Sequence, residues 1–149
     1  MSSLRVGLVK REHLPAVVSI ETARFSHPWS LEAFVGEWEK SVTYAPGVFV
    51  GEELIAYAFV SLIAPEAELN NIAVHPSYSR MGVASLLMNH IREVCCRRGI
   101  HRLLLDVNVN NKAALALYRR CGFTDDGVRK KYYRDGGDAQ LMSWEFDGE

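Results

Sequence analysis

The stretch from Asn71 to Ile91 reads NIAVHPSYSRMGVASLLMNHI, and it joins two kinds of periodicity through one polar turn. Its first residues continue an apolar run that is typical of a strand. From Ala84 onward, apolar residues recur at the three- and four-residue spacing of a helix. Arg80 and Gly82 lie between the two segments. The stretch therefore predicts a strand–turn–helix unit.

The composition of this turn suits an anion. The first backbone N–H groups of a helix have no partner within the helix and carry a partial positive charge. Gly82 and Ala84 would let a phosphate approach those groups, and Arg80 would add a guanidinium. The turn lacks both the Gly-Lys-Ser/Thr of a P-loop and the GxGxxG spacing of a dinucleotide site. An ordinary helix start with a surface arginine is the alternative that these residues leave open.

Outside this unit the chain alternates between strand-like and helix-like segments, which predicts a mixed α/β (α+β) sheet. We expect strands over residues 4–9, over 45–64 as two strands around Gly51–Glu53, over 66–74 and 101–109, and over 128–133 and 139–146 as a closing hairpin. We expect helices over residues 11–25, 30–38, 84–98 and 111–121. Ser30 and Asn111 are the expected N-caps, Trp29 is expected to pack on Phe34, and Gly99 and Gly122 are the expected C-terminal glycines.

Length and charge restrict the class of protein. With 149 residues and a hydrophobic share of 48%, the chain predicts one domain, residues 1–149. Lys+Arg 17 against Asp+Glu 18 is not the charge balance of a nucleic-acid-binding protein. No apolar run reaches the roughly 18 residues of a membrane span, and the N-terminus does not resemble a signal peptide. Three cysteines, two of them adjacent, suit a reducing cytoplasm. We expect neither nucleic acid nor membrane as a partner.

Three blocks of the sequence resemble one enzyme family. They read FSHPWS, LNNIAVHPSYSRMGVASLLM, and LLLDVNVNNKAALALYRRCGF with its KKYY sequel. Together they resemble the GNAT superfamily of acyl-CoA-dependent N-acetyltransferases, and within it the RimI-like ribosomal-protein-alanine N-acetyltransferases. The resemblance implies a single GNAT-like domain, in which helices flank a mostly antiparallel sheet with a splayed strand pair. It also implies acetyl-CoA as cosubstrate without a metal, and the N-terminal peptide of a ribosomal protein as acceptor.

The resemblance also assigns the acetyl-CoA contacts. The family's pyrophosphate loop, Gln/Arg-x-x-Gly-x-Gly/Ala, corresponds to Ser79–Ala84, with Ser79 in place of the usual glutamine or arginine. Backbone amides of this turn would hold the pyrophosphate, main-chain groups of the preceding strand would pair with the pantetheine arm, and an asparagine would contact that arm. The residues implied are Arg80, Met81, Gly82, Val83, Ala84 and Ser85 for the pyrophosphate, Ile72, Ala73 and Val74 for the pantetheine, and Asn111.

Two residues carry the expected chemistry. Strand alternation sets Asp106 apart from its apolar neighbours, and Tyr118 lies two helical turns from Asn111 on one helix face. By resemblance, the strand position is the general base and Tyr118 the general acid toward the leaving thiolate. Asp106 is about 1.5 Å shorter than the family's glutamate, so a relayed water, or Glu68 or Glu66 on another strand, are alternative routes. Capping by Asp106 and core packing by Tyr118 are the structural alternatives.

The implied reaction is direct attack of a neutral α-amine on the thioester in a ternary complex. An α-amine titrates near 7.7–8.0, whereas a lysine amine near 10.4 costs about 4–5 kcal/mol to neutralise at pH 7. A GNAT acting on lysine or a small amine, and a non-catalytic acyl-CoA-binding module, remain alternatives.

Other conspicuous residues carry weaker expectations. Tyr132, Tyr133 and Trp29 are candidates for the peptide groove. Cys121 is expected in the core, and the five histidines lack metal-ligand spacing, with His75 the nearest to the cofactor strand.

Overall fold

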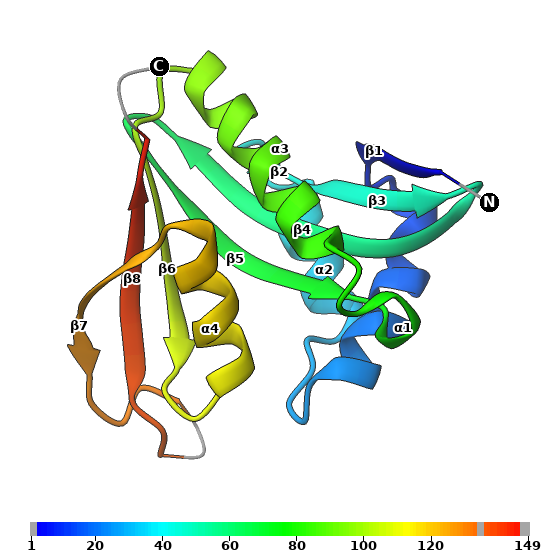
Figure 1. Ribbon diagram of the computed structural model, residues 1–149. Helices are drawn as coiled ribbons and strands as arrows, with labels where there is room; N and C mark the ends of the chain where they lie inside the picture. Colours follow the sequence, from blue (N-terminus) through cyan, green and yellow to red (C-terminus); the bar gives the residue numbers. More distant parts are fainter. Residues whose placement is uncertain (1–2, 134–135, 147–149) are drawn as a thin grey trace.

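The computed structural model describes residues 3–133 and 136–146, and the strands within these ranges form one mixed sheet (Figure 1). Its order is β1-β3-β4-β5-β6-β8-β7, with β2 beside β4. All neighbours pair antiparallel except β5 and β6, so the expectation of a mostly antiparallel sheet is confirmed. The strands are β1 Leu4–Leu8, β2 Thr43–Tyr44, β3 Pro46–Val50, β4 Glu53–Ile63, β5 Glu66–Val74, β6 Arg102–Asn108, β7 Thr124–Arg129 and β8 Ala139–Glu145.

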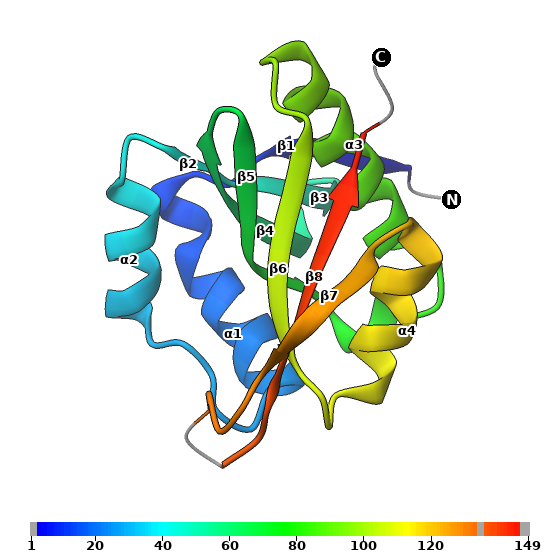
Figure 2. The same ribbon diagram turned by 90° about the vertical axis from the view of Figure 1, so that its left-hand side faces the viewer.

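Helices cover both faces of the sheet, α1 and α2 on one side and α3 and α4 on the other (Figure 2). They are α1 Leu14–Arg24, α2 Leu31–Glu39, α3 Val83–Arg97 and α4 Lys112–Cys121, with 3-10 turns η1 Arg11–His13 and η2 Pro76–Tyr78. None of the helices among the described residues has the length and apolarity needed to cross a bilayer.

The central strand β4 shows why two layers of helices form. Its residues 54–60 are all buried, because side chains of alternating orientation enter two different cores. Tyr57 and Phe59 pack with Phe34 of α2, whereas Ala58 faces the core that contains Leu87 of α3. The helix stripe predicted on α3 is buried as expected, except that Val83 rather than Ala84 occupies its first buried position.

Local signals place the helix ends correctly. The Ser30 hydroxyl accepts the Ala33 N–H at 3.1 Å, and the rings of Trp29 and Phe34 lie 5.0 Å apart, so both the cap and its apolar staple are confirmed. Gly122 ends α4 with a φ of 115°. That left-handed conformation has a low conformational energy only for glycine.

The chain end corrects one predicted strand. Residues 128–133 were expected to pair as one arm of a hairpin, but β7 runs over Thr124–Arg129 and ends before the two tyrosines. Lys131 has a φ of 50°, and its N–H donates to the Asp138 carboxylate at 2.9 Å. The N–H groups needed for a ladder therefore close a turn instead. The predicted connection at residues 134–138 falls partly outside the described residues. Strand β2, only two residues long, was not predicted.

Strands β5 and β6 run side by side for only a short distance. Their pairing is limited to Glu66–Glu68 with Arg102–Leu104, after which the strands diverge (Figure 1). Where β5 and β6 have diverged, β5 stays paired with β4, and β6 stays paired with β8. The sheet therefore splits between two strands whose outer neighbours hold them in place, and the expected splayed strand pair is confirmed.

Candidate active site

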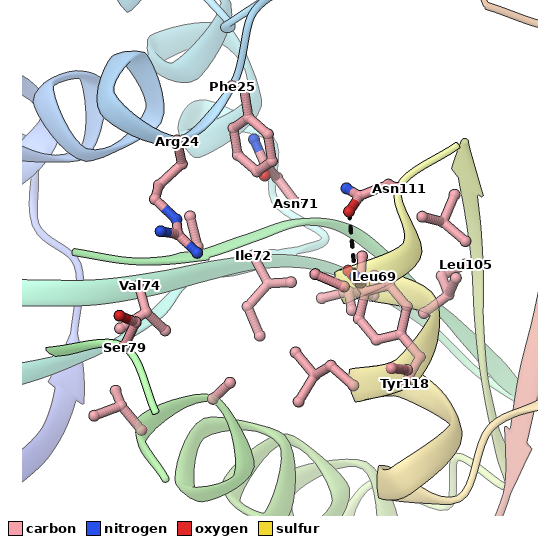
Figure 3. Close-up of a pocket in the computed structure, with 18 of the residues that line it drawn as sticks. Arg24, Phe25, Leu69, Asn71, Ile72, Val74, Ser79, Leu105, Asn111 and Tyr118 are labelled. Atoms are coloured by element: carbon pink, nitrogen blue, oxygen red, sulfur yellow. Dashed lines mark hydrogen bonds between the residues drawn. The ribbon is translucent and has the colours of Figure 1, made fainter. Parts of the chain in front are cut away.

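The split between β5 and β6 opens into a cavity of about 800 Å³, called here the first cavity. Its walls come from β5, the start of α3, β6 and α4. Figure 3 shows Ile72 of β5 and Tyr118 of α4 pointing into the same space, with Arg24 approaching from the end of α1. Most of the residues expected to bind acetyl-CoA line this cavity, namely Ile72, Ala73, Val74, Arg80, Gly82, Val83, Ala84, Ser85 and Asn111.

The turn before α3 lines the first cavity with Arg80 and Gly82. Both residues have a left-handed φ, 65° and 76°, and a turn that combines right- and left-handed residues can gather successive N–H groups into an anion-binding concavity. The first N–H to bond back into the helix is that of Leu86, to the Gly82 carbonyl at 3.0 Å. The amides of the preceding residues have no such helical partner. This geometry fits a diphosphate.

Two residues of the predicted loop behave differently from the rest. Met81 does not line the cavity and is 59% exposed, so its contact with acetyl-CoA stays a prediction. The Ser79 hydroxyl donates to the Pro76 carbonyl at 2.9 Å. Ser79 therefore stabilises η2, whereas the glutamine or arginine usual at this position has a longer side chain.

The cavity edge of β5 is suited to accept another extended chain. Ile72, Ala73 and Val74 pair with β4 on one side and have no β6 partner on the other. A bulge precedes them, because Phe59 and Val60 of β4 face Asn71 and Leu69, which leaves Asn70 as an extra residue. Bulges turn a strand locally and concentrate near active sites.

Helix α4 supplies both residues predicted on its cavity face. The Asn111 side chain caps the helix by accepting the Ala114 N–H at 3.2 Å, and Asn111 also lines the cavity. Tyr118 lines it two turns later, with its ring 5.7 Å from Phe123. Burial raises the pKa of Tyr118, and the neighbouring Cys121 and Asp106 raise it further. Its hydroxyl therefore keeps its proton at neutral pH.

Asp106 lies across the first cavity on β6. Its carboxylate accepts a hydrogen bond from the Tyr133 hydroxyl at 2.9 Å. Glu66 and Glu68, the alternative bases, do not line the cavity, because they lie where β5 and β6 are still paired. Glu66 is also ion-paired with Arg102 at 3.0 Å. The structure brings Asp106, and not the two glutamates, to the site.

A second cavity, of about 1080 Å³, adjoins the first. It is bounded by the segment that links α1 to α2, including Phe25 and Trp29, and by the loop from Asn108 to Asn111. Tyr133 lines both cavities, whereas Tyr132 lines neither. Of the three residues expected in a peptide groove, Trp29 and Tyr133 therefore line this cavity, and their contact with a peptide stays a prediction.

Glu21 is a feature that the sequence analysis missed. It is 2% exposed and lines the second cavity. Its Oε1 accepts from the Tyr57 hydroxyl and, at 3.0 Å, from the Asn71 amide, while its Oε2 accepts the Trp29 N–H at 3.0 Å. Burial is the largest cause of the raised pKa of Tyr57, and the bond to Glu21 adds to it. The signal was available: an acid stands four residues after Val17, on the buried stripe of α1.

Cys121 and His75 have structural roles. Burial raises the pKa of the Cys121 thiol, which leaves it a poor nucleophile, and the residue packs against the core as expected. The His75 ring accepts the Ser77 N–H at 3.0 Å at the start of η2. Within residues 3–133 and 136–146, no group of three or more His, Cys, Asp or Glu side chains could hold a metal ion.

Comparison with known proteins agrees with this geometry. The model of the Acetyltransferase (GNAT) family matches residues 14–123, so the predicted extent of the domain, 1–149, stays a prediction. The ribosomal protein bS18-alanine N-acetyltransferase of Escherichia coli (strain K12) is 34% identical over 142 residues, 93% of this chain and 95% of that protein. The N-alpha-acetyltransferase RimI of Mycobacterium tuberculosis is 32% identical over 144 residues, 92% of this chain and 89% of that protein.

A solved structure gives the same result. The crystal structure of the ribosomal-protein-S18-alanine N-acetyltransferase from Escherichia coli superposes with a TM-score of 0.89 and 31% identity, covering 99% of this chain and 97% of the other. Acetyl-CoA is the acyl donor that the GNAT family uses. With its split sheet, its amide-lined turn and these relatives, the chain is an acetyltransferase that belongs to the GNAT family, in its RimI-like branch.

Proposed function

We propose that this enzyme transfers the acetyl group of acetyl-CoA to the N-terminal α-amine of a protein, and that its acceptor is the N-terminal alanine of a ribosomal protein in the cytoplasm. The observation that carries the proposal is that a second cavity adjoins the first cavity, which Asp106 and Tyr118 line, and that Tyr133 lines both cavities. The first cavity, with its amide-lined turn, suits acetyl-CoA, and the second suits an extended peptide end. The names of the relatives suggest the ribosomal acceptor.

In the first cavity the chain would hold the cosubstrate chiefly through its main chain. The N–H groups of residues 80–85, with the Arg80 guanidinium, would bind the diphosphate. The open edge of Ile72–Val74 would pair with the amide-containing arm as an added strand would, and the Asn111 side chain lies where it can contact the same arm. This arrangement directs the thioester toward Asp106 and Tyr118.

The chemistry needs little more than orientation and two proton positions. An α-amine is neutral at pH 7 at a cost of about 1 kcal/mol, so a bound N-terminus can attack the thioester directly. Tyr118 retains its proton until negative charge develops on the departing sulfur, and then donates to it. Asp106 takes up the proton that the amine loses. No covalent intermediate on the protein is required.

A panel of amines tests the acceptor class. Purified protein would be given acetyl-CoA and a peptide that begins with alanine, the same peptide blocked at its N-terminus but containing lysine, or spermidine, with release of free CoA thiol as the readout. We expect turnover with the first peptide alone. Turnover confined to lysine or spermidine would refute N-terminal specificity, and binding of acetyl-CoA without turnover on any amine would refute catalysis.

Two substitutions test the catalytic assignment with the accepted amine. Asp106→Ala and Tyr118→Phe should each lower kcat by roughly 100- to 1000-fold. Tyr44→Phe is the matched control, because it removes a phenol hydroxyl that bonds to His90 and lies outside both cavities. Its kcat should equal that of the wild type. Wild-type turnover in both active-site variants would remove the assignment.

A further inference from the structure

The hydrogen bond between Tyr133 and Asp106 joins two segments that are 27 residues apart in the chain. Backbone hydrogen bonds hold Tyr133 in place. The Tyr133 N–H donates to the Gly137 carbonyl at 3.1 Å, and the Tyr133 carbonyl accepts the Gly136 N–H at 2.9 Å. The Val109 N–H, just after β6, donates to the Asp138 carbonyl at 3.0 Å. The hydroxyl and the carboxylate are therefore brought together by the fold.

Tyr133 lines the second cavity and also bonds to Asp106. Asp106 lines the first cavity and not the second, whereas Tyr133 lines both. An amine in the second cavity would therefore contact Tyr133, which bonds to the aspartate, whereas Asp106 itself does not line that cavity. Of the described residues that line both cavities, Tyr133 is the one with a hydroxyl, and the others are Arg24, Phe25, Asn70, Asn71, Asn108 and Asn111.

We propose that Tyr133 is a catalytic residue that relays the proton of the attacking amine to Asp106; this inference rests on the proposed function. As the amine nitrogen bonds to the thioester carbon, it becomes an ammonium. The Tyr133 oxygen accepts one proton from that nitrogen while its own hydroxyl proton passes to Asp106. The C–S bond breaks as Tyr118 protonates the sulfur. Asp106 then loses its extra proton and Tyr118 regains one by exchange with solvent, so both return to their starting states.

The relay explains how Asp106 can act as the base although it is shorter than the family's glutamate. An aspartate is about 1.5 Å shorter than a glutamate, and the phenol oxygen, 2.9 Å from Asp106, extends the carboxylate toward the second cavity. Burial, followed by the hydrogen bond to Asp106, raises the pKa of Tyr133, so its hydroxyl is protonated when the amine arrives. Glu21, a carboxylate that lines the second cavity, already accepts three hydrogen bonds.

A double-mutant cycle in the full-length enzyme tests the relay. The variants are Tyr133→Phe, Asp106→Asn and the double variant, assayed by CoA release from acetyl-CoA and the alanine-starting peptide, with Tyr44→Phe as the phenol control. Each single change should lower kcat by roughly 100-fold, at the bottom of the range for acid–base catalysis because an α-amine needs little help. The double variant should be no slower than the slower single variant, within about twofold.

The family's longer acid provides a second comparison. In an Asp106→Glu background the carboxylate itself reaches further, so adding Tyr133→Phe should cost less than about threefold in kcat. The relay would be overturned if the kcat loss of the Tyr133→Phe/Asp106→Asn double variant equalled the product of the two single losses. It would also be overturned by a Tyr133→Phe variant that changes only the KM for peptide. An equal cost of Tyr133→Phe in the Glu and wild-type backgrounds would overturn it too.

The two proposals fail in different ways. If the wild type acetylates lysine or spermidine instead of the peptide, the N-terminal assignment fails, and the same cycle run on that amine still decides the relay. If the wild type acetylates the peptide but the losses multiply, only the relay fails. Thermal melts of each variant identify any that has lost its fold.

Discussion

Glu21 should be essential to stability, and Glu21→Gln tests this with almost no change of volume. The carboxylate is buried and accepts hydrogen bonds from three donors, two at Oε1 and one at Oε2. A glutamine amide has only one oxygen. Its best orientation keeps that oxygen toward Tyr57 and Asn71, which places its NH₂ group against the Trp29 N–H. At least one buried donor is then left without an acceptor.

The expected loss of stability follows from the number of hydrogen-bond donors that the substitution leaves without an acceptor. One unsatisfied buried donor costs about 1–3 kcal/mol, and the two remaining bonds lose their charge assistance, for about 1 kcal/mol more. We therefore expect the free energy of unfolding to fall by roughly 2–4 kcal/mol. For a domain of this size that lowers Tm by about 5–15 °C. Tyr57→Phe, which removes one donor and leaves the other two, should cost less, about 1–2 kcal/mol.

Urea denaturation followed by circular dichroism measures the loss. Glu52→Gln is the matched control, because Glu52 is exposed in the turn between β3 and β4, and its change should stay within about 0.5 kcal/mol. The Trp29 N–H anchors the segment beside the second cavity, so Glu21→Gln should also raise the KM for peptide more than it lowers kcat. A Glu21→Gln protein as stable as the wild type would refute the reasoning, since it would mean that removing a buried charge offsets the lost bonds.

Two further predictions concern the backbone and the pH dependence of stability. Gly82→Ala should weaken acetyl-CoA binding and destabilise the fold by about 1 kcal/mol, because φ is 76° although the added methyl has open space. Gly36 also has open space for a methyl group but lies inside α2, so Gly36→Ala should stabilise the fold by about 0.5–1 kcal/mol. Equal effects of the two substitutions on acetyl-CoA binding, measured by isothermal calorimetry, and on thermal melts would contradict this. Burial raises the pKa of Cys95 from 9.0 to about 11, so above pH 9 the unfolded chain loses a proton that the folded chain keeps. Stability should therefore fall between pH 9 and 11 by roughly 1–3 kcal/mol, and the fall should be shallower in Cys95→Ala. Equal slopes in urea titrations at pH 8, 9 and 10 would contradict this cause.

The lesson of the chain end is that turn chemistry can override strand propensity. The residues VRKKYY have the β-branched and aromatic content of a strand, yet the ladder stops at Arg129. The Asp138 carboxylate accepts the Lys131 N–H, and the Gly137 carbonyl accepts the Tyr133 N–H. Neither acceptor belongs to the segment itself, so its own residues could not predict the turn.

What the sequence by itself determined is local. The cap at Ser30, the glycine at the end of α4, the face shared by Asn111 and Tyr118, and the turn at Arg80 were all predicted, because each depends on φ/ψ preferences or hydrogen bonds within a few residues. The tertiary structure decided the rest. It brings Asp106 to a tyrosine 27 residues away and Glu21 to donors as far as 50 residues away. It also separates β5 from β6, because each is held by its other neighbour in the sheet. Such contacts depend on how whole elements pack, and no short stretch of residues specifies that packing.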